Sequence, residues 1–200
     1  GANPPVQVEQ VPVRDLSQLP MDGGWTYGEL LGKAAAGDFR ANMLAGEYWM
    51  GLYYLNRGDL PLACLEHMQH FFREAAAKSG HPAPKLMMTD PYGIFGIFKA
   101  QPMQPEHAEW LDACRKLAEK GDMDAVTALY TVTDLPEAEL KHYLAPLEKK
   151  AASGDQDALA QLAFIRVDWL KEDPGKVLES LEKHRKNAKP VLLARMGELA

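Results

Sequence analysis

Apolar residues recur every three or four positions through most of the chain, and short polar stretches separate one run from the next. Between 59 and 78, for example, Leu65, Met68 and Phe72 would lie on one face of a helix. The run over 38–55 is apolar on much of its circumference, so we expect that helix to sit between neighbouring helices. The pattern predicts an all-α protein with helices over 26–36, 38–55, 59–78, 105–120, 122–131, 136–152, 155–171 and 176–186, and a last segment opened by Pro190.

The turn over residues 150–158 indicates how these helices end and begin. Gly154 follows a helix that closes with lysines and alanines, and it can adopt the left-handed conformation that ends a helix. Asp155 is then placed to cap the next helix, because its carboxylate can accept from unpaired backbone N–H groups. Ala158 is small and allows a close approach of the two helices. The stretch therefore predicts a bend between two antiparallel helices.

Three further stretches, 33–38, 76–81 and 117–124, repeat this turn. Alanine precedes the glycine in each copy and follows it by three or four positions, while His81 replaces the aspartate in one copy. The glycines at positions 37, 80, 121 and 154 are 43, 41 and 33 residues apart, by subtraction. Such intervals are typical of a two-helix repeat, so the copies predict stacked helix pairs.

The repeated pattern, Ala-Ala-x-x-Gly-Asp/His-x-x-Ala followed by Leu and small residues, resembles that of Sel1-like repeats, relatives of the tetratricopeptide repeat. The stretch from Gly37-Asp38 to Ala45-Gly46 matches the start of one repeat helix, and the resemblance covers roughly residues 27–170. It implies a right-handed solenoid of antiparallel helix pairs and a role in binding other proteins. It implies no catalytic residue.

Two segments fall outside the repeats. Residues 1–24 contain Pro4, Pro5, Pro12, Pro20 and Gly23-Gly24, which predict an extended N-terminal arm or linker before a helical repeat domain over 25–200. Residues 82–104 mix prolines and glycines with large apolar residues. We expect an irregular insertion there, a loop plus a short helix folded onto the array, because its Ile and Phe residues need burial. Alternatively, an apolar loop of this kind is the lip of a ligand pocket.

Aromatic residues on the second predicted helix give the candidate partner-binding surface. They are Tyr48, Trp49, Tyr53 and Tyr54. We expect most of them in the core, with one or two at the rim as an interaction surface. Together with the repeat pattern, they predict a non-enzymatic scaffold or adaptor that binds a protein partner and carries no cofactor.

The sequence lacks the common catalytic motifs, but a group of possible metal ligands gives an alternative to the protein-binding function. The segment 28–34 is one residue short of a phosphate loop and lacks the Ser or Thr that would bind magnesium, and no Gly-x-Ser-x-Gly elbow occurs. His67, His70 and Glu74 share one side of a predicted helix, at spacings from which side chains can ligate zinc. The alternative function is therefore a small-ligand or metal-binding helical protein with a pocket near the 90–98 loop.

Charge and hydropathy narrow the class of partner and the compartment. The net charge of −6 gives no general attraction to nucleic acid. No apolar run reaches the ~20 residues of a transmembrane helix. The chain starts at Gly1 without Met, which we interpret as removal of a secretion signal from a bacterial protein, predicting a periplasmic or secreted location. Removal of a tag would leave the same start, and a cytoplasmic location is the alternative.

Cys64 and Cys114 are the only cysteines. In an exported protein they could form a disulfide that closes a long loop and restrains the unfolded chain. We favour the other interpretation, in which both are small buried hydrophobic residues on helix faces.

Overall fold

The structure is a computed structural model that describes residues 16–19, 21, 24–55, 61–89 and 105–200. Its regular elements in these ranges are all helical, so the predicted all-α class is confirmed. The α-helices are α1 (Tyr27–Ala35), α2 (Phe39–Leu55), α3 (Pro61–Ser79), α4 (Pro82–Met87), α5 (Pro105–Glu119), α6 (Met123–Val132), α7 (Glu137–Ala152), α8 (Gln156–Asp168), α9 (Pro174–Leu181) and α10 (Pro190–Leu199); the 3-10 helices are η1 (Leu16–Gln18) and η2 (Glu182–Asn187).

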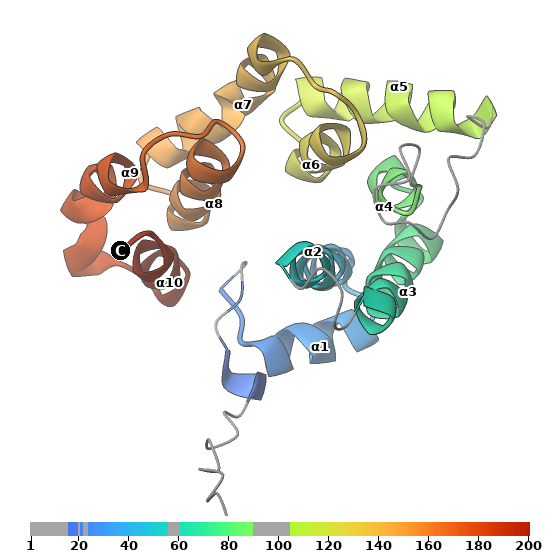
Figure 1. Ribbon diagram of the computed structural model, residues 1–200, viewed down its shortest axis with the longest axis horizontal. Helices are drawn as coiled ribbons and strands as arrows, with labels where there is room; N and C mark the ends of the chain where they lie inside the picture. The colour runs from blue at the N-terminus through green and yellow to red at the C-terminus, as the bar shows by residue number, and fades with distance from the viewer. Residues whose placement is uncertain (1–15, 20, 22–23, 56–60, 90–104) are drawn as a thin grey trace, which may run out of the picture.

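The helices follow a curved path, shown in Figure 1. Each α-helix packs against the next one along the chain, and two longer-range contacts join α4 to α6 and α8 to α10. Helices α2, α6, α8 and α10 lie on the inner side of the curve, with α1, α3, α5, α7 and α9 outside them (Figure 1). The inner helices therefore face one central region. Over the residues that the structure describes, none of the helices is long and apolar enough to cross a membrane.

The predicted turns have the backbone conformation that the sequence indicates. The glycines of all four turns have positive φ, from 65° at Gly80 to 91° at Gly154. At the last turn the Gly154 N–H donates to the carbonyl of Ala151 at 3.0 Å and the Asp155 N–H to that of Lys150 at 3.2 Å. This pair of bonds is the Schellman motif, and the turns after α1 and α5 form the same pair.

The residue after each glycine caps the following helix, as predicted. Asp155 Oδ1 accepts from the Ala158 N–H at 2.9 Å, and Asp38 and Asp122 accept in the same way from the alanine three residues later. These alanines are buried, which accounts for the small residue at that position of each turn. Local capping chemistry therefore fixes where α2, α6 and α8 begin.

His81 caps α4 in its own way and joins two turns. Its Nδ1 accepts from the Ala83 N–H at 3.0 Å, so the ring proton is on Nε2, which donates to Asp122 Oδ2 at 2.9 Å. Phe39 stacks on the imidazole with ring centroids 5.0 Å apart. The starts of α2, α4 and α6 thus meet at one histidine. Burial alone would raise the pKa of Asp122, but hydrogen bonds from His81 and a backbone N–H outweigh it and lower that pKa.

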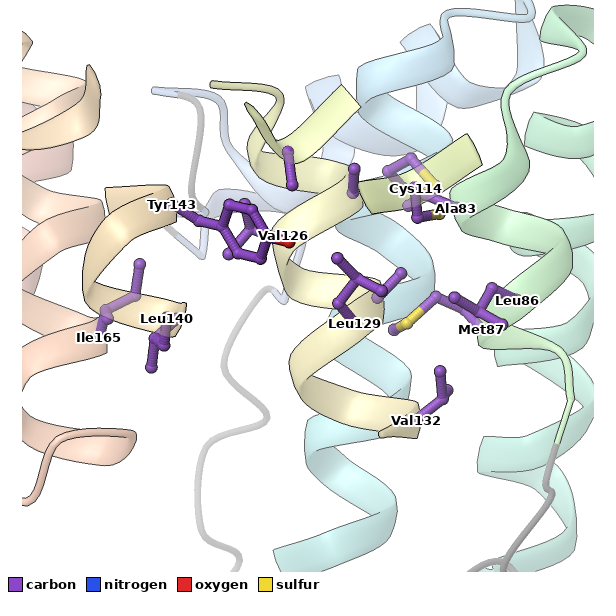
Figure 2. Close-up of a cluster of buried hydrophobic side chains, with 14 of the residues drawn as sticks. Ala83, Leu86, Met87, Cys114, Val126, Leu129, Val132, Leu140, Tyr143 and Ile165 are labelled. Carbon is purple, nitrogen blue, oxygen red and sulfur yellow. The ribbon is translucent and has the colours of Figure 1, made fainter. Parts of the chain in front are cut away.

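The largest core cluster centres on α6 and includes part of the predicted insertion. Figure 2 shows Leu129 of α6 facing Met87 of α4 on one side, while Leu140 and Tyr143 of α7 approach from the other. The short helix expected within 82–104 is α4, whose Leu86 and Met87 are buried, so residues 82–87 belong to the regular core rather than to an irregular excursion. Residues 90–104, including the 90–98 loop, lie outside the described ranges.

Helix α9 begins earlier than the sequence predicted. Asp173 caps it by accepting from the Lys176 N–H at 3.0 Å, and Pro174 occupies its first turn, where the missing N–H costs nothing. The residues expected to form a turn at 173–175 are thus the cap and the first turn of the helix. The predicted helix over 176–186 is divided into α9 and η2.

One glycine in α2 sets the distance to α3. A Cβ added at Gly46 would lie 2.5 Å from Cε1 and 2.8 Å from Cζ of the fully buried Phe72 ring. Backbone and aromatic ring are therefore in direct contact, and only glycine fits.

Both cysteines are buried free thiols, which agrees with the favoured interpretation. Burial, with a contribution from the charge of Asp122, raises the pKa of Cys114 to about 12. A thiol with so high a pKa is a poor nucleophile at neutral pH.

The described end of the predicted N-terminal arm contacts the helical domain. Helix η1 packs against α1, the Tyr27 N–H donates to the carbonyl of Leu19 at 2.8 Å, and the Met21 N–H donates to that of Trp25 at 2.8 Å. Residues 1–15 of the arm lie outside the described ranges.

Candidate functional site

The inner helices enclose a cavity of about 950 Å³. In α6, α8 and α10 the lining residues are spaced as expected for one face of a helix, and α2 contributes such a face together with the consecutive residues 50–52 near its end. Met21 of the arm and Trp25, just after it, form part of the wall. The lining residues on the inner helices are Arg40, Leu44, Glu47, Tyr48, Met50, Gly51 and Leu52 of α2; Thr127, Tyr130 and Thr131 of α6; Asp157, Ala160, Gln161, Phe164 and Ile165 of α8; and Val191, Arg195 and Glu198 of α10, with Thr133, Asp134, Leu135 and Trp169 from the segments after α6 and α8.

Contacts between helix ends give the relative direction of the four helices. Arg40 Nη1 lies 2.6 Å from Asp124 Oδ1, which joins the start of α2 to the start of α6. The Gln156 side chain bonds the Asn187 carbonyl at 2.8 Å and the Lys189 N–H, which joins the start of α8 to the start of α10. At the opposite end, Tyr130 of α6 stacks on Trp169 after α8. We infer that the four helices run in one direction around the cavity, with their carboxyl ends at a common mouth.

Aromatic rings form the wall between α6 and α8. Tyr130 and Trp169 stack with centroids 4.1 Å apart and planes at 15°, and Phe164 meets the Trp169 ring at 6.3 Å and 73°. Phe164 is 36% exposed, a high value for a large apolar side chain on a cavity wall. The Arg195 guanidinium lies 4.9 Å from the Phe164 ring centre, a cation–π contact. This wall offers both apolar surface and π faces to an occupant.

Charged groups of both signs line the same cavity, with carboxylates in the majority. Each guanidinium contacts a carboxylate, since Arg40 bonds Asp124 and Arg195 Nη1 bonds Glu198 Oε2 at 2.6 Å. Burial raises the pKa of Asp124 even though the Arg40 charge acts to lower it. The cavity therefore has apolar walls with a few polar groups directed into it, the composition usual for a binding pocket.

Of the predicted partner-binding residues, Tyr48 lines the cavity and Trp49 does not. Burial raises the pKa of the Tyr48 phenol, and its ring lies 5.5 Å from that of Tyr27. Trp49 is half-buried, packs against the core cluster and stacks on the exposed ring of His67 at 4.4 Å. The structure describes the backbone of Tyr53 and Tyr54 but not their side chains, so their part in binding stays a prediction.

The predicted zinc ligands are not assembled into a metal centre. His67 stacks on Trp49, and His70 meets the Phe71 ring edge at 5.2 Å. Within 24–55, 61–89 and 105–200, no three His, Cys, Asp or Glu side chains form a group that could hold a metal ion. The geometry thus gives no support to a zinc site at His67, His70 and Glu74.

Most of the residues that line the cavity were not predicted from the sequence, although their spacing along the inner helices follows a pattern. Counted from the cap residue, lining positions recur five or six and nine residues later in all four inner helices, and two residues later in α2, α8 and α10. The position nine residues after the cap, for example, is Glu47 in α2, Thr131 in α6, Phe164 in α8 and Glu198 in α10. Aligning the turns before α2, α6 and α8 would therefore have selected one face of each of these three helices, although neither α10 nor the fact that these faces share a cavity.

Comparison of the chain with protein-family models, with curated proteins and with solved structures finds no match. The chemistry of the cavity is accordingly interpreted from its own residues.

Proposed function

We propose that the chain is a helical-repeat interaction module of the Sel1-like type, whose central cavity receives a peptide segment of a partner protein. The proposal includes the solenoid of helix pairs and a non-enzymatic adaptor role, both of which stay predictions from the repeated turns. The periplasmic or secreted location and the bacterial origin likewise stay predictions from the sequence.

The observation that supports the proposal is the way in which four successive inner helices line the cavity. Stacked helix pairs give an extended inner surface to which successive units each contribute one face, and this cavity is lined by one stripe from each of four helices. Side chains of a bound peptide would meet apolar and aromatic walls, while its main chain would meet the hydroxyls of Thr127 and Thr131 and the amide of Gln161. This combination suits a short segment better than a flat protein surface.

Gly51 offers a substitution that fills the cavity without disturbing the core. It lies in α2 and lines the cavity, and a Cβ added there meets no atom within 4 Å. Gly51→Leu should therefore place an isobutyl group in the open space and raise the helix propensity of α2 at the same time. Gly32→Leu is the matched control, because Gly32 is an exposed position of α1 with equally open space and does not line the cavity.

Random short peptides displayed on phage, selected on the full chain, test the proposal. We expect a set of peptides that bind the unmodified chain and the Gly32→Leu variant but are lost on Gly51→Leu, while all three proteins show cooperative thermal unfolding. The proposal fails if no selected peptide distinguishes the Gly51→Leu variant from the other two proteins.

The volume of the cavity also favours a second candidate, a small organic ligand. About 950 Å³ is near the upper end of the range of small-molecule pockets, roughly 300–1,000 Å³. The described residues 82–89 do not line this cavity, and the predicted pocket near the 90–98 loop lies outside the described ranges. Native mass spectrometry of the purified chain would detect a retained molecule. A mass increase from a bound molecule that is present in Gly32→Leu and absent from Gly51→Leu would favour this candidate. If both variants show only the mass of the polypeptide, the result would count against it.

A further inference from the structure

The charge distribution around the cavity indicates which kind of peptide it takes. We infer that the occupant is a segment of net positive charge, with a lysine or arginine beside an apolar side chain. The inference rests on the proposed function and specifies the partner of the same cavity.

The first argument is the balance of charged side chains. Two guanidiniums line the cavity, and each already bonds a carboxylate, as described above. Asp134 and Asp157 are exposed lining residues that form no hydrogen bond or ion pair with any other residue that the structure describes. The carboxylates of the lining are Glu47, Asp134, Asp157 and Glu198, and the guanidiniums are those of Arg40 and Arg195. An occupant without cationic groups would leave the carboxylates of Asp134 and Asp157 without a counter-charge among the described residues.

The second argument is the direction of the helices. A helix carries a partial negative charge at its carboxyl end, where the last carbonyls lack intrahelical partners. The carboxyl ends of α2, α6, α8 and α10 lie at one mouth of the cavity, as inferred above from the contacts between helix ends. Asp134 comes two residues after the end of α6 and Glu198 is in the last turn of α10, so both carboxylates lie at that mouth. Side chains and helix dipoles therefore favour a cation at the same place.

The third argument explains the apolar neighbour. Phe164 keeps 36% of its surface exposed on the cavity wall, beside the stacked rings of Tyr130 and Trp169. Covering these rings needs an aliphatic or aromatic side chain, which gains free energy from leaving water. The Arg195 guanidinium over Phe164 demonstrates that this wall accepts a cation against an aromatic face. A basic residue next to an apolar one matches both features.

The peptides that bind in a cavity-dependent manner test this inference. Those that bind the unmodified chain and fail on Gly51→Leu should be enriched in lysine and arginine relative to the unselected library. Anisotropy titrations with the tightest of them should show about two- to five-fold weaker binding for Asp134→Asn and for Asp157→Asn, and a smaller salt dependence in both. Glu148→Gln is the control, since Glu148 is an exposed position of α7 outside the cavity.

The outcomes separate the inference from the proposed function. Cavity-dependent peptides with neutral or acidic composition would overturn the charge preference and leave the peptide-binding function standing. Equal affinities of Asp134→Asn, Asp157→Asn and Glu148→Gln would also overturn it, because the attraction would then come from the overall charge of the chain. If no cavity-dependent peptide is found, the proposed function fails, and this inference fails with it.

Discussion

The histidine that replaces aspartate in the second turn gives a sharp test of how the turns are coupled. His81 caps α4 through Nδ1 and donates from Nε2 to Asp122, the cap of α6. An aspartate at this position, as in the other three turns, would bring two carboxylates together in a partly buried site. We therefore predict that His81→Asp destabilises the chain more than His81→Asn, although aspartate and asparagine are equally good caps.

The size of the effect follows from the geometry. Both variants lose a hydrogen bond to a charged acceptor, about 1.5 kcal/mol, and the stacking of the imidazole on Phe39. In His81→Asp the new carboxylate would lie near the position of Nδ1, at about 5 Å from that of Asp122, where two like charges repel by about 3 kcal/mol at an effective dielectric constant of about 20. The two side chains are only 15% and 28% exposed, so solvent and salt screen part of this repulsion. We expect a difference of about 2 kcal/mol between the variants.

Thermal unfolding followed by circular dichroism measures the difference. For a chain of this length, about 2 kcal/mol corresponds to melting temperatures about 4–8 °C apart at pH 7. The pKa values of two adjacent carboxylates rise in the folded state, so their repulsion destabilises at neutral pH and is relieved as the pH falls toward about 4. The two melting temperatures should converge in that window. Equal melting temperatures at pH 7, or a gap that does not change with pH, would refute the proximity of the two caps.

Three further predictions concern stability and reactivity. Gly51→Ala should stabilise α2 by about 0.5–1 kcal/mol, because alanine has the higher helix propensity and its Cβ meets no other atom. Gly46→Ala should be less stable than Gly51→Ala by about 2 kcal/mol in urea unfolding, because its Cβ would lie within 2.5–2.8 Å of a buried ring of α3. Equal unfolding midpoints for the two variants would mean that α2 and α3 lie further apart. The thiols of Cys64 and Cys114 should react with a disulfide reagent at pH 8 only after denaturation, because both are buried and the pKa of Cys114 is about 12. Rapid labelling of the native chain would contradict this burial. Because folding lowers the pKa of Asp122, the contribution of its carboxylate to the free energy of unfolding is complete above about pH 4 and is lost as the pH falls through the pKa in the folded state. The unfolding curves of Asp122→Asn and of the unmodified chain should therefore converge in acid. A difference in stability that stays constant with pH would exclude this linkage.

The helices and their boundaries could be predicted from the sequence because their signals are local. Gly154 and Asp155 end one helix and start the next through bonds to backbone atoms within five residues, and any chain that carries this pattern offers the same bonds. The same reason explains the miss at α9, where Asp173 and Pro174 were assigned to a turn although together they are a cap and a first helical position. Neither case depends on tertiary contacts.

Local sequence signals did not determine which aromatic residues of α2 face the cavity. Tyr48 and Trp49 are neighbours of similar character, yet one lines the cavity and the other packs against the core cluster and stacks on the exposed ring of His67. Which of two adjacent side chains faces inward depends on the rotation of α2 against α1 and α3. That rotation is set by close packing, such as the contact between Gly46 and Phe72, which joins residues 26 positions apart by subtraction.

The sequence alone determined the helical class and the four capped turns, because backbone hydrogen bonding and the burial of apolar faces act within one or two turns of a helix. Only the tertiary structure decided that His81 bonds Asp122 and that stripes from α2, α6, α8 and α10 enclose one cavity. The packing of successive helices sets these distances, and small rotations at each interface add up along the chain. No pattern within a single helix encodes that sum, and so the cavity with its acidic mouth is a property of the assembled helices.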